Sequence, residues 1–84
     1  MAKRQRSSQL TKETKRYQQE LRRFGQGLRQ IRVQRRWTIE RAAERMDLDP
    51  AHLAKIEGGR INVSFVTLVR IARGFDVAIG GLFA

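Results

Sequence analysis

Apolar residues in the first third of the chain recur every three or four positions. This spacing is typical of one stripe along an amphipathic helix. Its members are Leu10, Tyr17, Leu21, Phe24, Leu28 and Ile31. The spacing predicts a helix from about Thr11 to Arg35, or a shorter helix that begins near Tyr17 after a loose arm. Gly25 and Gly27 lie off the stripe and would allow a kink.

A second, shorter amphipathic helix is predicted between Thr38 and Met46. Thr38 is a suitable N-cap because its hydroxyl can accept a hydrogen bond from the first turn. Glu40 then lies in that turn, where the helix dipole favours an acid. The apolar residues of this segment follow the i, i+3, i+4, i+7 pattern, and they are Ile39, Ala42, Ala43 and Met46.

The next residues predict a tight turn followed by a third helix. Asp47 is one of the few residue types that tolerate the left-handed conformation. Asp49 precedes proline, so its backbone is kept out of the helical region, as an N-cap requires. Pro50 fits the first helical position. The third helix should therefore run from Pro50 to about Glu57 and stop at Gly58–Gly59.

A fourth helix is predicted after Ser64, which is placed to cap it, and Asp76 is a second candidate for a left-handed stop. Its apolar stripe is Phe65, Leu68, Ile71, Ala72 and Phe75. The chain then closes in a short helix or turn with four apolar residues, Val77, Ile79, Leu82 and Phe83. All these stripes are expected to pack one core, which makes the fold all-α.

Charge divides the chain into two unequal parts. The net charge is +10, and residues 1–36 hold 12 Lys/Arg against 2 Glu, whereas residues 37–84 hold 6 Lys/Arg and 6 Asp/Glu. The whole excess thus lies in the first part, which indicates a polyanionic partner. Residues 1–16 are expected to form a basic N-terminal arm or extension and residues 17–84 the folded domain.

Composition excludes several function classes. There are 84 residues, no cysteine and a single histidine, His52, so we expect no disulfide, no metal site and no cofactor. No Ser/His/Asp set, phosphate loop or paired carboxylates stand out, so we expect no enzyme. The basic start is not followed by an apolar stretch, and we expect a cytoplasmic, nucleoid-associated protein without a membrane partner.

Two short helices joined by three residues follow the helix-turn-helix plan. From about Phe24 to Phe83 the chain resembles the Cro/Xre-type, or lambda repressor-like, domain. The resemblance is carried in order by Leu28–Arg32, Trp37–Arg45, Leu53–Arg60 and Leu68–Ala72. It implies a compact five-helix domain that binds double-stranded DNA as a homodimer and regulates transcription. Here a basic N-terminal helical extension or arm precedes the domain.

The resemblance makes residues 50–57 the recognition helix that enters the major groove. Helical geometry places the side chains of Ala51, Ala54 and Lys55 opposite those of Leu53 and Ile56. The expected base contacts are Ala51, His52, Ala54 and Lys55. Lys55 would donate to guanine, and an alanine methyl would meet thymine. His52, one step around the helix, either reaches a phosphate or edge base or has no special role.

Other positions are expected to contact phosphates or to shape the domain. Ile39 stands where the family often has a glutamine that touches the DNA backbone. The expected phosphate contacts are Arg36, Thr38, Arg60, Asn62 and, in the basic arm, Lys3, Arg4 and Arg6. Glu57 is expected to make a structural hydrogen bond or ion pair within the domain instead of facing DNA.

The C-terminal apolar residues Val77, Ile79, Leu82 and Phe83 are expected to form the dimer interface or to be ordinary core. Small controller proteins and the DNA-binding antitoxins of toxin–antitoxin pairs resemble this layout, and the sequence does not separate them. A protein-interaction adaptor is the main alternative, because the recognition helix offers few hydrogen-bonding side chains. RNA binding lacks the aromatic platform that base stacking requires.

Overall fold

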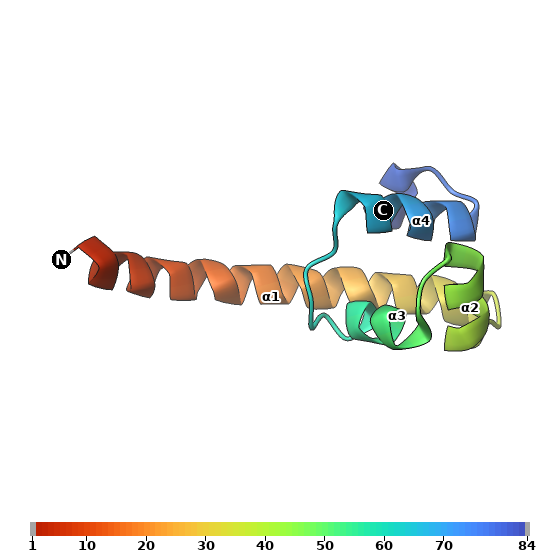
Figure 1. Ribbon diagram of the computed structural model, residues 1–84, viewed down its shortest axis with the longest axis horizontal. Helices are drawn as coiled ribbons and strands as arrows, with labels where there is room; N and C mark the ends of the chain where they lie inside the picture. Colours follow the sequence, from red (N-terminus) through yellow and green to blue (C-terminus); the bar gives the residue numbers. More distant parts are fainter. Residues whose placement is uncertain (1, 84) are drawn as a thin grey trace.

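The computed structural model describes the backbone of residues 2–83 and the side chains of residues 13–83. Over the described backbone the chain forms four α-helices and one 3-10 helix, with no strand. They are α1 (Ala2–Gln34), α2 (Ile39–Met46), α3 (Pro50–Glu57), α4 (Phe65–Phe75) and η1 (Ile79–Phe83). Figure 1 shows α1 as a long rod whose C-terminal half is surrounded by the other elements. The all-α prediction is confirmed, and the fifth element is a 3-10 helix rather than an α-helix.

The first helix, α1, begins at Ala2, which is earlier than the expected starts at Thr11 or Tyr17. Lys, Arg, Gln, Glu and Leu dominate this segment, and all of them favour helix. The helix also passes through Gly25 and Gly27 without interruption. Gly25 has a packing role, because a Cβ atom there would collide with the backbone carbonyl oxygens of Ile56 and Glu57.

The predicted helix ends are confirmed by their caps. The Thr38 hydroxyl accepts a hydrogen bond from the Arg41 amide at 3.1 Å, and the Ser64 hydroxyl accepts one from the Thr67 amide at 3.2 Å. The last residues of α2 and α4 are followed by Asp47 (φ 56°) and Asp76 (φ 58°), both left-handed as expected. These ends follow from local chemistry between side chain and backbone.

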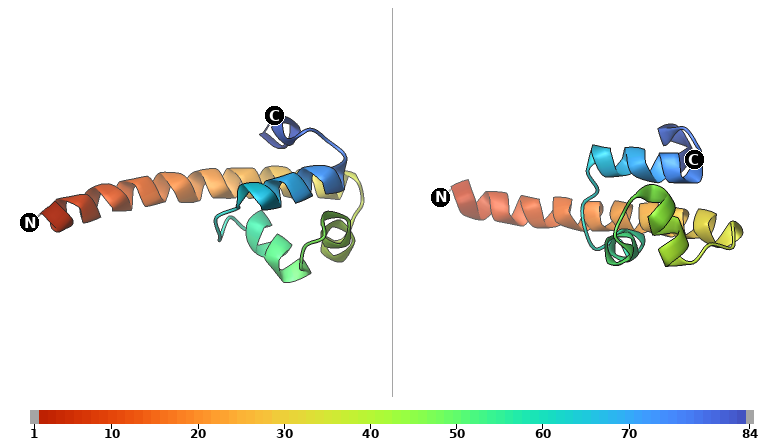
Figure 2. Two further views of the ribbon diagram at one scale, coloured as in Figure 1. Left: turned by 45° about the horizontal axis from the view of Figure 1, so that its top comes forward. Right: turned by 45° about the vertical axis from the view of Figure 1, so that its right-hand side comes forward.

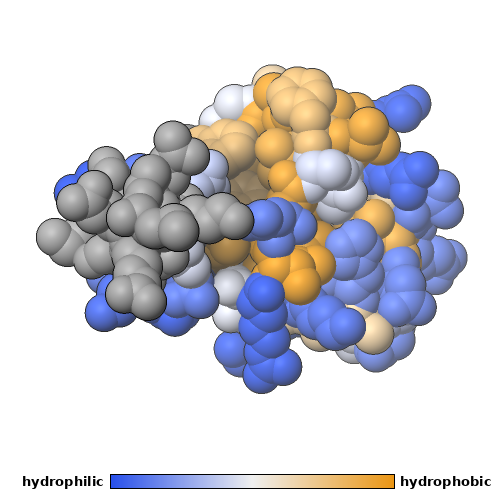
Figure 3. Space-filling model, turned by 60° about the vertical axis from the view of Figure 1, so that its left-hand side comes forward, coloured by the Kyte–Doolittle hydropathy of each residue, from blue (hydrophilic) through white to orange (hydrophobic). Residues whose placement is uncertain are grey.

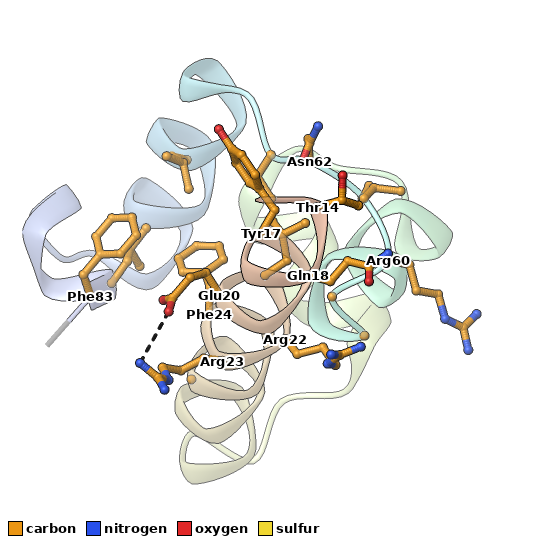
Figure 4. Close-up of a pocket in the computed structure, with 18 residues that line it drawn as sticks. Thr14, Tyr17, Gln18, Glu20, Arg22, Arg23, Phe24, Arg60, Asn62 and Phe83 are labelled. Atoms are coloured by element: carbon orange, nitrogen blue, oxygen red, sulfur yellow. Dashed lines mark ion pairs between the residues drawn. The ribbon is translucent and has the colours of Figure 1, made fainter. Parts of the chain in front are cut away.

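The core lies between α1, α2, α3 and α4 and is closed by η1 (Figure 2). Its buried apolar members are Leu28, Ala42, Ala43, Met46, Leu53, Ile56, Ile71, Ala72, Phe75 and Leu82. Among the described residues, three members of the predicted apolar sets are largely exposed: Tyr17 at 66%, Phe65 at 69% and Phe83 at 62%. Tyr17 lies on α1 at an open groove beside the loop that follows α3 (Figure 4). On α4, Thr67 is buried while Phe65 lies outside the arc that faces the core.

The connection between α1 and α2 is anchored by stacked side chains. The Trp37 ring lies 5.8 Å from the Phe75 ring and nearly parallel to it. The guanidinium groups of Arg35 and Arg45 lie over the Trp37 ring, 5.1 and 4.7 Å from its centre. Such cation–π contacts favour a fixed ring, so the start of α2 is held in place. Among the described residues no helix has the length and apolarity needed to cross a membrane.

Candidate nucleic-acid interface

Helices α2 and α3 form the expected helix-turn-helix, joined by the three residues between Met46 and Pro50. The turn ends at Asp49, whose carboxylate accepts hydrogen bonds from the amides of Ala51 (3.0 Å) and His52 (3.3 Å). Pro50 occupies the first turn of α3. The prediction of a capped, proline-led third helix is therefore confirmed.

One side of α3 is buried and the other faces solvent. Leu53 and Ile56 are almost completely buried, whereas Ala51, Ala54 and Lys55 are exposed. His52 is half-buried at the boundary between these faces. The exposed face thus presents two methyl groups and one ammonium group, and no element of the described chain covers it. This arrangement is what a helix needs in order to enter a DNA groove.

An ion pair fixes the C-terminal end of α3 against α1. The Arg32 guanidinium donates to the two carboxylate oxygens of Glu57 at 2.7 and 3.0 Å, and also to the Trp37 carbonyl at 2.9 Å. The hydrogen bond to Glu57 raises the pKa of the Arg32 guanidinium above its usual value, although burial acts in the opposite direction. Arg32 therefore stays charged, and the expected structural role of Glu57 within the domain is confirmed.

The expected phosphate contacts lie on both sides of α3. Thr38 is exposed at the start of α2, and Arg36 precedes it in a left-handed conformation (φ 60°). Arg60 and Asn62 are exposed in the loop that follows α3, on the side away from α2 (Figures 1 and 4). Side chains of Lys3, Arg4 and Arg6 lie outside the described residues.

Ile39 does not replace the family's glutamine with another polar contact. Its side chain is half-buried and packs against the core. The start of α2 therefore offers a phosphate its backbone amides and the Thr38 hydroxyl, which already accepts the capping hydrogen bond.

The four C-terminal residues expected at a dimer interface do not form one exposed face. Leu82 is buried in the core, and Val77 and Ile79 are half-buried against it. Phe83 is 62% exposed, and its ring stacks on that of Phe24 with 5.1 Å between centres.

Sequence reasoning missed the further exposed apolar residues, Tyr17, Phe65 and Val66. Phe65 and Val66 lie outside the i, i+4, i+8 series Thr67, Ile71 and Phe75 that is buried in α4, and this spacing could be read from the sequence. Figure 3 shows one face of the molecule, on which hydrophobic surface is bordered by hydrophilic side chains. An open groove nearby is lined by Tyr17, Leu21, Phe24, Val63, Leu68 and Phe83 (Figure 4).

Comparisons with known proteins agree with this geometry. Residues 23–80 match the family described as helix-turn-helix domain. The chain is 35% identical over 63 residues to the control protein C.MunI of Mycoplasma sp., a match that covers 74% of this chain and 85% of that protein.

Two solved structures share the architecture. The restriction-modification controller protein C.AhdI from Aeromonas hydrophila matches with a TM-score of 0.74 and 33% identity, over 76% of this chain and 97% of that one. The clp gene regulator ClgR from C. glutamicum matches with a TM-score of 0.68 and 24% identity, over 74% and 80% of the two chains, and shows likeness of fold alone. With its capped α2–turn–α3 unit and these relatives, the chain belongs to the Cro/Xre-type helix-turn-helix family of DNA-binding transcriptional regulators.

Proposed function

We propose that this regulator binds duplex DNA as a homodimer with α3 in the major groove and controls genes of a restriction-modification system. The observation that carries the proposal is the exposed face of Ala51, Ala54 and Lys55, held outward by buried Leu53 and Ile56. The link to restriction-modification rests on the likeness to C.AhdI, which is described as a controller of such a system. A regulator of this kind works in the cytoplasm, at the nucleoid.

Base recognition by this face combines one strong donor with two apolar contacts. The Lys55 ammonium would donate to O6 or N7 of guanine, and the methyl groups of Ala51 and Ala54 would pack on thymine methyls. His52, at the boundary of the face, would reach an edge base or a phosphate. Because only Lys55 carries a hydrogen-bonding group on the central face, shape and phosphate contacts supply much of the affinity.

Phosphate contacts would orient α3 from both sides. Arg36, Thr38 and the amides at the start of α2 would meet one strand, and Arg60 and Asn62 the other. The basic residues at the chain start, Lys3, Arg4 and Arg6, would form an additional arm contact. They read no bases in this proposal, so deletion of residues 2–8 should weaken binding to all duplexes about equally.

The dimer would form through the C-terminal side of the domain. Phe83 provides the exposed apolar contact, with Val77 and Ile79 at its margin. Leu82 would support this surface from the core instead of touching the partner. A two-fold symmetric dimer would place two α3 helices in successive turns of the major groove.

Selection of bound sites from random duplexes tests the proposal. We expect a two-fold symmetric site with half-sites about one helical turn, roughly 34 Å, apart. Lys55→Ala should relax the preference at one base pair in each half-site. Arg70→Ala removes an exposed charge from α4 and should leave the preference unchanged. An identical site profile for wild type and Lys55→Ala would refute the assignment of Lys55.

A protein-interaction or antitoxin module is the second candidate, favoured by the small alanine side chains on α3 and the exposed Tyr17, Phe65 and Phe83. The salt dependence of duplex binding separates the two candidates. A steep fall of affinity with salt indicates many phosphate contacts. No duplex binding even at low salt would favour the interaction module.

A further inference from the structure

Four basic side chains recur along α1 at every seventh position. They are Lys15, Arg22, Arg29 and Arg36, all exposed, with Arg36 just beyond the helix end. Seven residues bring a helix back to nearly the same side, with a drift of only about 20°. Lys15, Arg22 and Arg29 therefore follow one side of α1 at intervals of about 10 Å. Arg36 lies two residues beyond the helix end, and we call these four residues the basic row.

The side of α1 that carries the basic row is free of acids. Other residues on this side are mainly glutamines, together with the exposed Val33. The two acids of α1, Glu13 and Glu20, lie on the opposite side by helical geometry. Glu20 is there paired with Arg23 at 3.6 Å. The positive charges of the row are thus separated from the negative charges of the same helix.

The basic row runs beside α3. Gly25 is the position where the end of α3 touches α1, since an added Cβ would meet the carbonyls of Ile56 and Glu57. Arg22 and Arg29, three residues before and four after Gly25, are its neighbours on the helix surface. On the other flank of Gly25 lies the core. The row therefore borders α3 on the solvent side.

A second contact continues the row into the loop after α3. A Cβ atom on Gly59 would come within 2.6 Å of the Arg22 Cα, so the two backbones touch directly. Arg60 follows immediately. Figure 4 shows Arg22 and Arg60 on the same side of the domain, whereas Arg23 lies toward Phe83. Glu57, the acid at the end of α3, is paired with Arg32.

We propose that Lys15, Arg22 and Arg29 form, with Arg36, a second contact to the DNA backbone that lies alongside the groove occupied by α3. This inference rests on the proposed function and adds a phosphate-binding surface to it. The helical part of the row, from Lys15 to Arg29, spans 14 residues, or about 21 Å, which is more than half of one turn of duplex. Its partner is the phosphate backbone, regardless of sequence. Lys15 and Arg22 precede residues 23–80, so the match to the family does not include them.

Paired substitutions on the full-length chain test the surface. Lys15→Gln/Arg22→Gln removes two charges from the row, and the matched control Arg16→Gln/Arg23→Gln removes two charges from other sides of the same helix. All four residues are exposed and glutamine favours helix, so both variants should fold, as circular dichroism would verify. Lys15→Gln/Arg29→Gln repeats the test while keeping the Arg22–Gly59 contact.

Duplex binding is then measured by fluorescence anisotropy over a series of salt concentrations, on a selected site with flanks and on an unrelated duplex. Each row variant should reduce the slope of log affinity against log salt by about 1.8 per protomer, the value for two phosphates. Affinity should fall about equally on both duplexes, and the site profile should stay the same. The control pair should change the slope by less than half as much.

The inference is wrong if wild type binds with a steep salt dependence and the row variants retain its slope, or if the control pair lowers it equally. In both cases the proposed function stands. If wild type binds no duplex at any salt concentration, the proposed function itself fails and the inference fails with it.

Discussion

The guanidinium of Arg32 and the carboxylate of Glu57 form a two-point ion pair, 25 residues apart in sequence, that joins α1 to the last residue of α3. The two side chains are only 13% and 7% exposed. An ion pair in such surroundings fixes the position of α3 against α1, because either side chain alone would be a largely buried, unpaired charge. The position of α3 therefore depends on a contact that lies outside the proposed DNA-binding face.

Glu57→Gln should destabilise the protein by about 2–4 kcal/mol, because it leaves the Arg32 guanidinium without a counter-charge. Urea denaturation followed by circular dichroism measures the free energy of unfolding. Glu44→Gln, an exposed glutamate on α2, is the control and should change it by less than about 0.5 kcal/mol. A loss no larger than that of the control would contradict the role given to the pair.

Gly25→Ala and Gly27→Ala should have opposite effects on stability. Both residues lie inside α1, where alanine is favoured over glycine by about 1 kcal/mol. A Cβ at Gly27 meets nothing within 4 Å, so Gly27→Ala should stabilise the protein by about 0.5–1 kcal/mol. At Gly25 the Cβ would collide with the end of α3, and the free energy of unfolding should fall by about 1–3 kcal/mol.

Thermal denaturation of the two variants gives the comparison directly. Gly25→Ala should also weaken duplex binding, since α3 has to shift, and Gly27→Ala should not. If both variants were more stable than wild type, α3 would not lie against α1 at Gly25.

Asp49 caps α3 through its carboxylate, and it also places a negative charge close to the helix that we propose enters the DNA groove. Asp49→Asn keeps the capping oxygen, so stability should change little, while duplex binding at low salt should tighten. Asp49→Ala loses the cap and should cost about 1 kcal/mol of stability. Urea denaturation and anisotropy titrations distinguish the two effects, and weaker binding by the stable Asn variant would disprove the charge effect.

Phe83→Ala should shift the protein from dimer to monomer in sedimentation equilibrium without unfolding it. Phe83 is largely exposed and its ring stacks on that of Phe24. The substitution should therefore lower the stability of a single folded protomer only modestly. Val33→Ala, which shortens an exposed residue on another side of α1, is the control. A dimer that persists unchanged in Phe83→Ala would place the interface elsewhere, with Tyr17 and Phe65 the next residues to replace.

Much of the fold was predictable because the helix ends depend on neighbouring residues. Thr38, Asp49 and Ser64 cap helices through their own side chains, and Asp47 and Asp76 stop them by adopting a left-handed backbone. The exposure of Tyr17 was not predictable in this way. It depends on how much of α1 the other helices cover, which is a property of the tertiary arrangement.

In the candidate site, too, some features follow from the local sequence and others depend on the tertiary arrangement. The outward direction of Ala51, Ala54 and Lys55 followed from the helical spacing against Leu53 and Ile56. The seven-residue spacing of the basic row could also be seen in the sequence, but the position of the row beside α3 could not. That position depends on the backbone contact at Gly25, and glycine in a helical pattern more often suggests a kink than a close approach.

The absence of a side chain at Gly25 couples the positions of α1 and α3. The backbones of α1 and α3 meet directly at this point, so a displacement of α1 would be passed on to α3. A force that displaced the N-terminal part of α1 would then move α3 as well. If α3 binds DNA as proposed, its affinity would therefore respond to a second molecule bound to the N-terminal part of α1.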